Sequence, residues 1–288
     1  MQKPICLITG GTEGVGRATA IALAKKGFTV VLAARNASKA EGVKQEIAKA
    51  AGNTDTDHVV ADLASLQQTR ALAETFKRRH PRLDALINNA GVFLPTRTET
   101  EDGYETSYQV NYLSHFLLTN LLLEELKKSE QGGIINLSSS VYSIGKFRVD
   151  DVQGEKRFSL VGTYAATKLF MLMFTKELAK RLAGTRVTAN AVHPGIVRTP
   201  MMMHAPGAFR IASYLSLPFS ISPEKGARTS VYLATSPDVR RDSGHYFTNS
   251  KKTPTKNKFD TEENRALLWE LSLKSIQEPT AAAIDQAG

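Results

Sequence analysis

Cysteine and long apolar runs are nearly absent from this chain of 288 residues. The single thiol, Cys6, cannot form an internal disulfide, and its apolar neighbours indicate a small buried side chain. No stretch approaches the roughly 18 to 20 apolar residues of a membrane-spanning helix, since the longest, residues 116–123, runs into two glutamates. No signal peptide precedes the first predicted strand. We therefore expect a soluble, cytoplasmic protein with no transmembrane segment.

Metal-binding patterns and basic stripes are missing as well. The six histidines have no metal-ligand spacing and the acids form no paired cluster, so we expect no metal site. The formal net charge is +9, but the basic residues stand in pairs and triples, mostly at the ends of predicted helices, where cations complement the helix dipole. Without a basic stripe that interleaves with aromatics, nucleic acid is not the expected partner. A phosphate on a bound ligand accounts better for part of this charge.

What the chain does contain is an alternation of short apolar runs with longer amphipathic segments. Strands are predicted at residues 5–9, 29–33, 59–61, 83–87, 133–137 and 187–192, and helices at residues 15–26, 37–51, 66–79, 105–128, 163–182, 223–234 and 260–275. Helices of this length between strands predict an α/β fold, a doubly wound parallel sheet with helices on both faces. We expect one domain over residues 1–277, with a long substrate loop at 195–222, and a flexible tail at 278–288.

A glycine-rich turn, TGGTEGVG, occupies residues 9–16 between the first predicted strand and its helix. Glycine permits a tight turn and lets the backbone approach a pyrophosphate, to which the N-terminus of the following helix offers N–H groups. Such a turn alone is common, but between a strand and a helix it predicts a Rossmann-type dinucleotide site. The expected cofactor-binding residues in this turn are Gly10, Thr12, Glu13, Gly14, Val15 and Gly16.

The end of the second predicted strand distinguishes between the two nicotinamide dinucleotides. NAD sites usually carry Asp or Glu there, whereas this chain has the sequence AARN at residues 33–36. The guanidinium of Arg35 could grip a 2′-phosphate, and Arg17 is a second candidate. Either arginine could instead be a solvated surface residue. We expect NADP(H) as the cofactor.

Polar and small residues also follow the third and fourth predicted strands. An acid at residue 62 could face the adenine amino group, and the sequence NNAG at residues 88–91 suits a close approach of backbone to ligand. Plain turns are the alternative in both places. The expected cofactor site therefore also includes Asp62, Leu63, Asn89, Ala90 and Gly91.

Tyr164 and Lys168 are four residues apart in a predicted helix, so the two side chains can share one pocket. Free tyrosine has a pKa of about 10, and a neighbouring ammonium favours the phenolate and lowers that pKa. A hydroxyl from the serines at residues 138–140, which follow the fifth predicted strand, could then hold a substrate carbonyl. A Tyr–Lys pair at this spacing is common by chance, so it carries weight only together with the other motifs.

Six elements occur together in one order: the glycine turn, the NNAG segment, Asn111, the serine run, Tyr164 with Lys168, and Pro194-Gly195. With this set, spread over residues 5 to about 200, the chain resembles the short-chain dehydrogenase/reductase family. Four further tracts look closest to its retinol dehydrogenase-like branch: IINLSS at residues 134–139, GEKRF at 154–158, HPG at 193–195 and SGHYF at 243–247.

The resemblance implies a role for each matching residue. Tyr164 would donate or accept the proton at the carbonyl, and Lys168 would bind the nicotinamide ribose and hold Tyr164 toward phenolate. Ser139 would hydrogen-bond the substrate oxygen, with the two flanking serines as alternatives, and Asn111 would support a water-linked proton path. The remaining cofactor contacts would come from Pro194, Gly195, Val197 and Thr199.

These roles predict an enzyme, an NADP(H)-dependent oxidoreductase that transfers hydride between the nicotinamide and a small apolar aldehyde, ketone or alcohol. Methionines and aromatics in the loop at residues 196–221 suit such a substrate, although core packing would look similar. Members of the branch that handle retinoids often carry an N-terminal membrane anchor, and this chain begins almost at its first strand, which argues against a membrane-resident retinoid role. The alternative is a non-catalytic NADP(H)-binding protein for redox sensing or interaction. A homo-oligomer stays open.

Two expectations concern packing. The charged segment at residues 145–162, which matches an insertion of the same branch, is expected to be a surface excursion. Trp269 stands among the leucines of the last predicted helix and is expected in the core.

Overall fold

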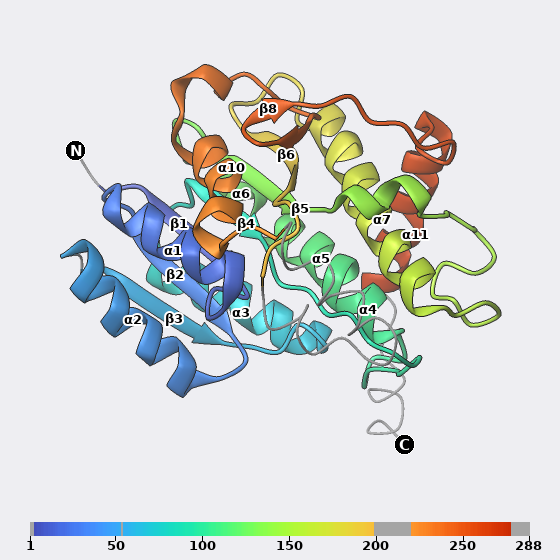
Figure 1. Ribbon diagram of the computed structural model, residues 1–288, viewed down its shortest axis with the longest axis horizontal. Helices are drawn as coiled ribbons and strands as arrows, with labels where there is room; N and C mark the ends of the chain where they lie inside the picture. Colours follow the sequence, from blue (N-terminus) through green and yellow to red (C-terminus); the bar gives the residue numbers. More distant parts are fainter. Residues whose placement is uncertain (1–2, 53, 199–219, 278–288) are drawn as a thin grey trace.

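The computed structural model describes residues 3–52, 54–198 and 220–277 (Figure 1). Within those ranges, eight strands form one sheet in the order β3-β2-β1-β4-β5-β6-β7-β8. The strands are β1 (Ile5–Thr9), β2 (Thr29–Ala34), β3 (Thr56–Val60), β4 (Ala85–Asn88), β5 (Gly133–Leu137), β6 (Thr188–His193), β7 (Tyr246–Thr248) and β8 (Lys251–Lys252). The first seven are parallel, and β8 pairs antiparallel with β7. The chain therefore has the predicted single-domain, doubly wound Rossmann fold.

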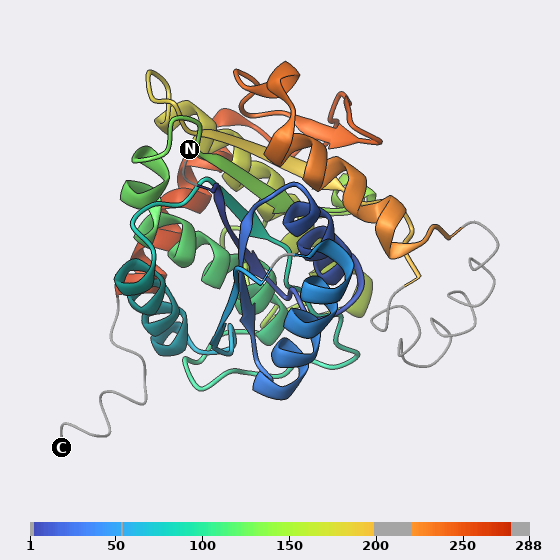
Figure 2. The ribbon, with the colours of Figure 1, turned by 90° about the vertical axis from the view of Figure 1, so that its left-hand side faces the viewer.

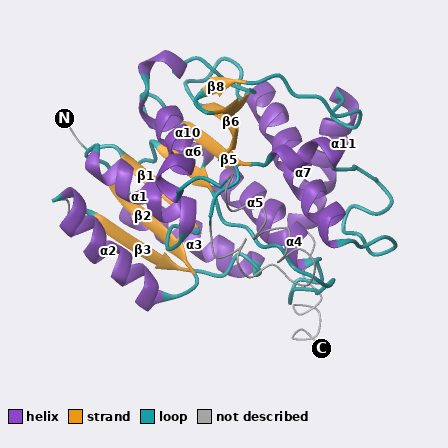
Figure 3. Cartoon of the chain, in the orientation of Figure 1, coloured by secondary structure: helices purple, strands orange, loops and turns teal. Residues whose placement is uncertain are grey.

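Helices cover both faces of the sheet (Figures 2 and 3). One face carries α1 (Gly14–Lys25), α2 (Ala37–Ala51) and α10 (Pro223–Thr235). The other carries α3 (Leu66–Arg79), α5 (Ser114–Leu121), α7 (Leu160–Arg181) and α11 (Glu262–Gln277). Alternate residues of β1 join different cores: Cys6 and Ile8 pack on the α1 side, and Leu7 packs on the α7 side. Both faces of a strand are buried in such a sheet, which is why its strands are continuous apolar runs.

The helix predicted at residues 105–128 is broken into shorter elements. It consists of α4 (Thr106–Tyr108), a π-helical turn η1 (Gln109–Leu113), α5 and, after an irregular Leu122, α6 (Leu123–Lys127). No proline or glycine marks these breaks, so the sequence pattern could not place them. π-helical turns inside helices often occur at functional sites, and this one contains Asn111.

The other boundaries differ from prediction by a few residues, and two short strands were not predicted. The β7 and β8 strands span three and two residues, too few to show a period. The packing predictions for Cys6 and Trp269 are confirmed, because both side chains are buried. The charged segment lies largely at the surface, apart from the buried Gly145 and Phe147. The Phe147 ring packs 5.9 Å from that of Phe170.

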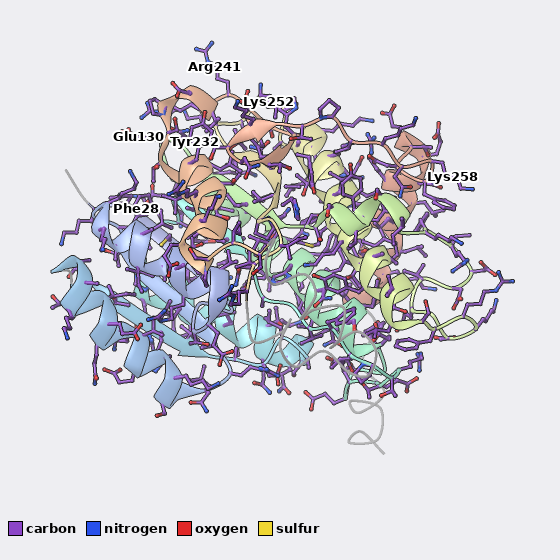
Figure 4. All side chains as sticks on the ribbon, in the orientation of Figure 1. Phe28, Glu130, Tyr232, Arg241, Lys252 and Lys258 are labelled. Atoms are coloured by element: carbon purple, nitrogen blue, oxygen red, sulfur yellow. The ribbon has the colours of Figure 1, made fainter. Side chains whose placement is uncertain are left out.

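Basic side chains extend from several separate parts of the surface. In Figure 4, Arg241, which follows the short 3₁₀ helix η4 (Pro237–Val239), and Lys258, before α11, point outward in different directions. The ammonium of Lys252 on β8 lies 2.6 Å from a carboxylate oxygen of Asp242. None of the helices described is both long enough and apolar enough to cross a bilayer.

Candidate active site

A cavity of about 720 Å³ opens at the carboxyl ends of the parallel strands. It is lined by the segments that follow β1, β2, β3, β4, β5 and β6, and by the first turns of α1 and α7. Parallel doubly wound sheets bind ligands at this end, next to the point where the strand order reverses. That point lies here between β1 and β4. A second hollow, of about 1000 Å³, lies at the amino ends of the strands beside Pro4 and Val187 and contains none of the predicted site residues.

The fold brings together nearly all the residues predicted for the site. Tyr164, Lys168 and Ser139 line the cavity, as do the predicted cofactor-binding residues Gly10, Thr12, Glu13, Gly14, Val15, Gly16, Arg35, Asp62, Leu63, Asn89, Ala90, Gly91, Pro194, Gly195 and Val197. Asn111 lies directly behind this lining, while Thr199 and most of the predicted substrate loop lie outside the described residues.

The glycine turn leaves room and hydrogen-bond donors for a pyrophosphate. Gly10 and Gly14 have φ angles of 63° and 53°, a conformation that L side chains rarely adopt. A Cβ atom on Gly16 would lie only 2.3 Å from the carbonyl oxygen of Gly10, so no side chain fits there. Glu13, at the N-cap of α1, makes no side-chain cap hydrogen bond. The first N–H groups of α1 therefore remain available to an anion, and the turn fits the phosphates of a dinucleotide.

The side chain of Asn89 stabilises the glycine turn by hydrogen bonds to its backbone. Its Nδ2 donates to the carbonyl oxygens of Thr9, at 2.8 Å, and Gly10, at 3.1 Å. Because this amide holds the turn itself, Asn89 shapes the cofactor site as well as lining it.

A cationic corner of the cavity lies after β2. The guanidinium of Arg35 is exposed there and has no ion-pair partner among the described residues. Lys39, which the sequence interpretation missed, lines the same corner and forms an ion pair with Glu13. The position of Lys39 is set by Asn36, whose Oδ1 accepts from the Lys39 N–H at 2.9 Å and caps α2. The spacing of four residues between Arg35 and Lys39 is the signal that could have found it.

Arg17, the second candidate for the phosphate, does not line the cavity and is paired with a carboxylate elsewhere. Its Nε donates to Glu46 on α2 at 2.6 Å, and its side chain does not line the cavity. This guanidinium pairs with a carboxylate 29 positions away in the sequence, whereas Arg35 forms no ion pair within the described residues.

Helix α7 carries the central pair. Ser159 caps the helix by accepting from the Gly162 N–H at 3.2 Å, which places Tyr164 in the first turns, at the cavity. The Tyr164 hydroxyl has no hydrogen-bond partner within the described chain and is free to meet a substrate. The Lys168 Nζ lies 5.5 Å from the centre of the Tyr164 ring and donates to the carbonyl of Leu137 at 3.0 Å. The two side chains do share one pocket, as their spacing indicated.

The protonation of this pair differs from the sequence-based expectation. Burial raises the pKa of Tyr164 to about 12 and lowers the pKa of Lys168 to about 8. Loss of hydration is the cause of both shifts, and no lowering of the Tyr164 pKa by the Lys168 ammonium accompanies it. The Lys168 ammonium lies near the Tyr164 ring and donates a hydrogen bond to the backbone carbonyl of Leu137. Tyr164 is therefore a protonated phenol at neutral pH.

Of the three serines, the geometry favours Ser139. The Ser138 hydroxyl is buried and donates to the carbonyl of Lys168 at 2.8 Å. Ser140 is exposed and begins the 3₁₀ helix η2 (Ser140–Ile144). The Ser139 hydroxyl lines the cavity and has no hydrogen-bond partner in the part of the chain that the structure describes.

Asn111 is held rigidly in the π-helical turn. Its Oδ1 accepts from the Val92 N–H at 2.6 Å, and its Nδ2 donates to the Val92 carbonyl at 2.9 Å. A Cβ atom on Gly91 would lie 3.3 Å from the Asn111 Oδ1 and 3.7 Å from the Lys168 Nζ. Asn111 and Lys168 therefore meet at Gly91, although the side-chain amide of Asn111 is already occupied by the backbone.

The part of the cavity next to Tyr164 is apolar. Phe93 packs edge-on against Tyr164, with 5.1 Å between ring centres and planes at 78°. Val141, Val161 and Ile196 also line the cavity. Ile196 belongs to the predicted substrate loop, whereas sequence reasoning missed Phe93, Val141 and Val161. Phe93 follows the NNAG segment by only two positions. No group of three or more His, Cys, Asp or Glu side chains able to hold a metal occurs among the described residues.

Comparisons with known proteins agree with this geometry. Residues 4–207 match the family model described as short chain dehydrogenase. The chain is 43% identical over 285 residues to retinol dehydrogenase 14 of Mus musculus, covering 94% of this chain and 85% of that protein. It is 38% identical over 276 residues to polyprenol dehydrogenase of Homo sapiens, covering 93% and 83%. A short chain dehydrogenase of Shigella flexneri, solved in complex with NADP, is 27% identical with a TM-score of 0.69, covering 87% and 98%. The chain therefore belongs to the short-chain dehydrogenase family of oxidoreductases, in its retinol dehydrogenase-like branch.

Proposed function

We propose that this protein transfers a hydride between NADP(H) and a small apolar carbonyl or alcohol, with Tyr164 as the acid–base group. The observation that carries the proposal is the cavity itself, where the unbonded hydroxyls of Ser139 and Tyr164 meet an apolar wall beside Lys168. A site of this composition can hold a single carbonyl oxygen by two hydroxyls while the rest of the substrate contacts apolar side chains.

The residues of the site divide between holding the cofactor and moving a proton. The glycine turn and the first N–H groups of α1 would hold the pyrophosphate, and the segments after β4 and β6 would border the nicotinamide end. The nicotinamide supplies or accepts the hydride when bound. Ser139 would hydrogen-bond the substrate oxygen. Tyr164, whose pKa burial raises to about 12, would donate its proton to that oxygen in carbonyl reduction.

Lys168 and Asn111 would support Tyr164 rather than contact the carbonyl. The Lys168 ammonium, held by the Leu137 carbonyl, can interact with the phenolate that forms once Tyr164 has given up its proton. Asn111 would keep the wall at Val92 and Gly91 in place next to that ammonium.

NADP(H) is favoured over NAD(H) by the cationic corner after β2. Arg35 and Lys39 line it, and the Glu13 carboxylate, which also lines the cavity, is paired with Lys39. The complex of the Shigella flexneri protein with NADP is consistent with this preference. A 2′-phosphate in this corner would meet a guanidinium that has no competing ion pair.

We expect Arg35→Ala to weaken NADPH binding by about 10- to 100-fold, because a charge-assisted hydrogen bond contributes about 1.5–3 kcal/mol. NADH lacks the 2′-phosphate, so its affinity should change less than about twofold. Dissociation constants of both dinucleotides, measured by fluorescence titration, give the ratio. Arg17→Ala is the matched control, since that guanidinium is bound to Glu46 outside the cavity. Equal losses for NADPH and NADH in Arg35→Ala would exclude the assigned role.

The names of the relatives support an apolar alcohol or aldehyde as substrate, since they are retinol and polyprenol dehydrogenases. The decisive assay follows NADPH consumption by the purified protein with a panel of aldehydes, ketones and quinones, and NADP⁺ reduction with the matching alcohols. We expect turnover that increases with the apolar area of the substrate. Tight NADPH binding without turnover of any substrate would instead favour the non-catalytic, redox-sensing alternative.

A further inference from the structure

His115 lies in the core at the start of α5, fully buried, and no step proposed above uses it. Its Nε2 lies 2.9 Å from the Thr9 Oγ1, at the end of β1 where the glycine turn begins. Its Nδ1 lies 3.3 Å from the carbonyl oxygen of Asn111, one helical turn earlier in the chain. The imidazole thus connects the cofactor turn to the π-helical turn that carries Asn111.

The hydrogen bonds around Thr9 determine which nitrogen carries the proton. The N–H groups of Asn89 and Ala90 donate to the Thr9 Oγ1 at 2.9 and 3.0 Å, which occupies both lone pairs of that hydroxyl. The hydroxyl can therefore only donate, and its nearest acceptor is the Nε2 of His115, because the Ile87 carbonyl is farther away at 3.4 Å. With Nε2 as an acceptor, a neutral imidazole has its proton on Nδ1, where it can be donated to Asn111.

The charged form of His115 is disfavoured at this place. Burial, together with the ammonium of Lys168, lowers the pKa of His115 to about 4, against the opposing effect of the hydrogen bond to Asn111. A charged imidazole would also place a second N–H against the already saturated Thr9 hydroxyl. The hydrogen-bond pattern and the electrostatics agree on a neutral ring.

We propose that His115 is a positioning residue of this site, a neutral imidazole that ties the cofactor turn at Thr9 to Asn111. On one side the imidazole accepts a hydrogen bond from the Thr9 hydroxyl, which itself accepts from the N–H groups of Asn89 and Ala90. Both of these residues line the cavity. On the other it holds the carbonyl of Asn111, whose amide fixes Val92, another lining residue. The consequence for turnover rests on the proposed function, whereas the tie between the two segments does not.

The first test of this inference needs no activity. Long-range ¹⁵N–¹H correlation spectra of the ¹⁵N-histidine-labelled protein at neutral pH report which ring nitrogen is protonated. We expect the His115 Nδ1 to give the shift of a protonated nitrogen and Nε2 that of an unprotonated one. A proton on Nε2, or on both nitrogens, would overturn the assignment whether or not the protein is an enzyme.

The second test separates the two ends of the tie. Asparagine at position 115 can donate to the carbonyl one turn earlier, as Asn120 does to Phe116 at 2.8 Å in the same helix, but it is too short to reach Thr9. Glutamine can place an acceptor near Thr9 but does not replace the bond to the Asn111 carbonyl. We therefore expect His115→Asn to weaken NADPH binding with a smaller effect on kcat, and His115→Gln to lower kcat with a smaller effect on NADPH binding. Each loss should be about 3- to 10-fold, the range for one net hydrogen bond.

His115→Phe fills the space without either hydrogen bond and should show both losses. Asn120→Leu is the matched control, because it removes a side-chain bond to the backbone of α5 with no link to Thr9. If His115→Phe changes neither the NADPH dissociation constant nor kcat by more than Asn120→Leu does, His115 only fills the core. A wild-type protein without turnover would contradict the proposed function, while the spectra and NADPH affinities would still test the tie.

Discussion

Tyr164→Phe should lower kcat by about 10²- to 10⁴-fold, the range that a positioned acid–base group contributes. The substitution removes one hydroxyl and leaves the ring, its edge-on contact with Phe93 and the neighbouring Lys168 Nζ in place. That hydroxyl has no bond to lose within the described chain, so the fold should be unaffected. Stopped-flow measurement of NADPH oxidation gives the rate, and a fluorescence titration should show NADPH affinity within about twofold of the wild type.

The matched control is Tyr232→Phe. Tyr232 lies on α10 (Figure 4). It packs against the α1-side core and is not among the residues that line the cavity. It should retain full turnover. A Tyr164→Phe protein that binds NADPH normally and keeps more than about a tenth of the wild-type kcat would contradict the acid–base role. Such a result would mean that Ser139 or a water molecule supplies the proton.

Trp269→Ala should lower the free energy of unfolding by about 3–5 kcal/mol, as expected for truncation of a large buried aromatic. Trp269 is 6% exposed on α11. Its ring lies 4.9 Å from that of Phe116 on α5 and 5.9 Å from that of Phe174 on α7, with the Arg181 guanidinium 4.2 Å from its centre. The indole therefore joins the two helices that carry His115 and the Tyr164–Lys168 pair. Urea denaturation followed by circular dichroism measures the loss.

Leu267→Ala is the control for the same helix, since Leu267 is 39% exposed. It should change the free energy of unfolding by about 0.5 kcal/mol or less, as most surface substitutions do. A loss below about 1 kcal/mol in Trp269→Ala would mean that α11 is not anchored through this aromatic cluster. The activity of the folded fraction then shows whether loosening α5 and α7 also disturbs the site.

The sequence was sufficient to predict the layout of the fold because strand and helix periods are local. The apolar runs of β1 and β5 and the amphipathic period of α3 identify those elements within their own residues. The place of the cofactor site followed from one topological rule, that the carboxyl ends of parallel strands meet at one edge. The roles of Ser139, Tyr164 and Lys168 followed from the resemblance to the short-chain dehydrogenase/reductase family. This is why residues as distant as Gly10, Arg35 and Tyr164 could be assigned to one cavity from their motifs and their places after strands or in helices.

Only the tertiary structure decided how the side chains within that cavity are used. Arg17 and Arg35 look alike in sequence, and a carboxylate on another helix pairs with Arg17 while Arg35 lines the cavity. Ser138 and Ser139 are neighbours, yet the carbonyl of Lys168 takes one hydroxyl and leaves the other free. The pKa of Tyr164 depends on the hydration that its ring and hydroxyl lose in the cavity, and the position of His115 depends on its contact with Thr9, 106 positions away. Local patterns specify which elements form, whereas hydrogen bonding, ion pairing and hydration at one atom depend on what distant segments place beside it.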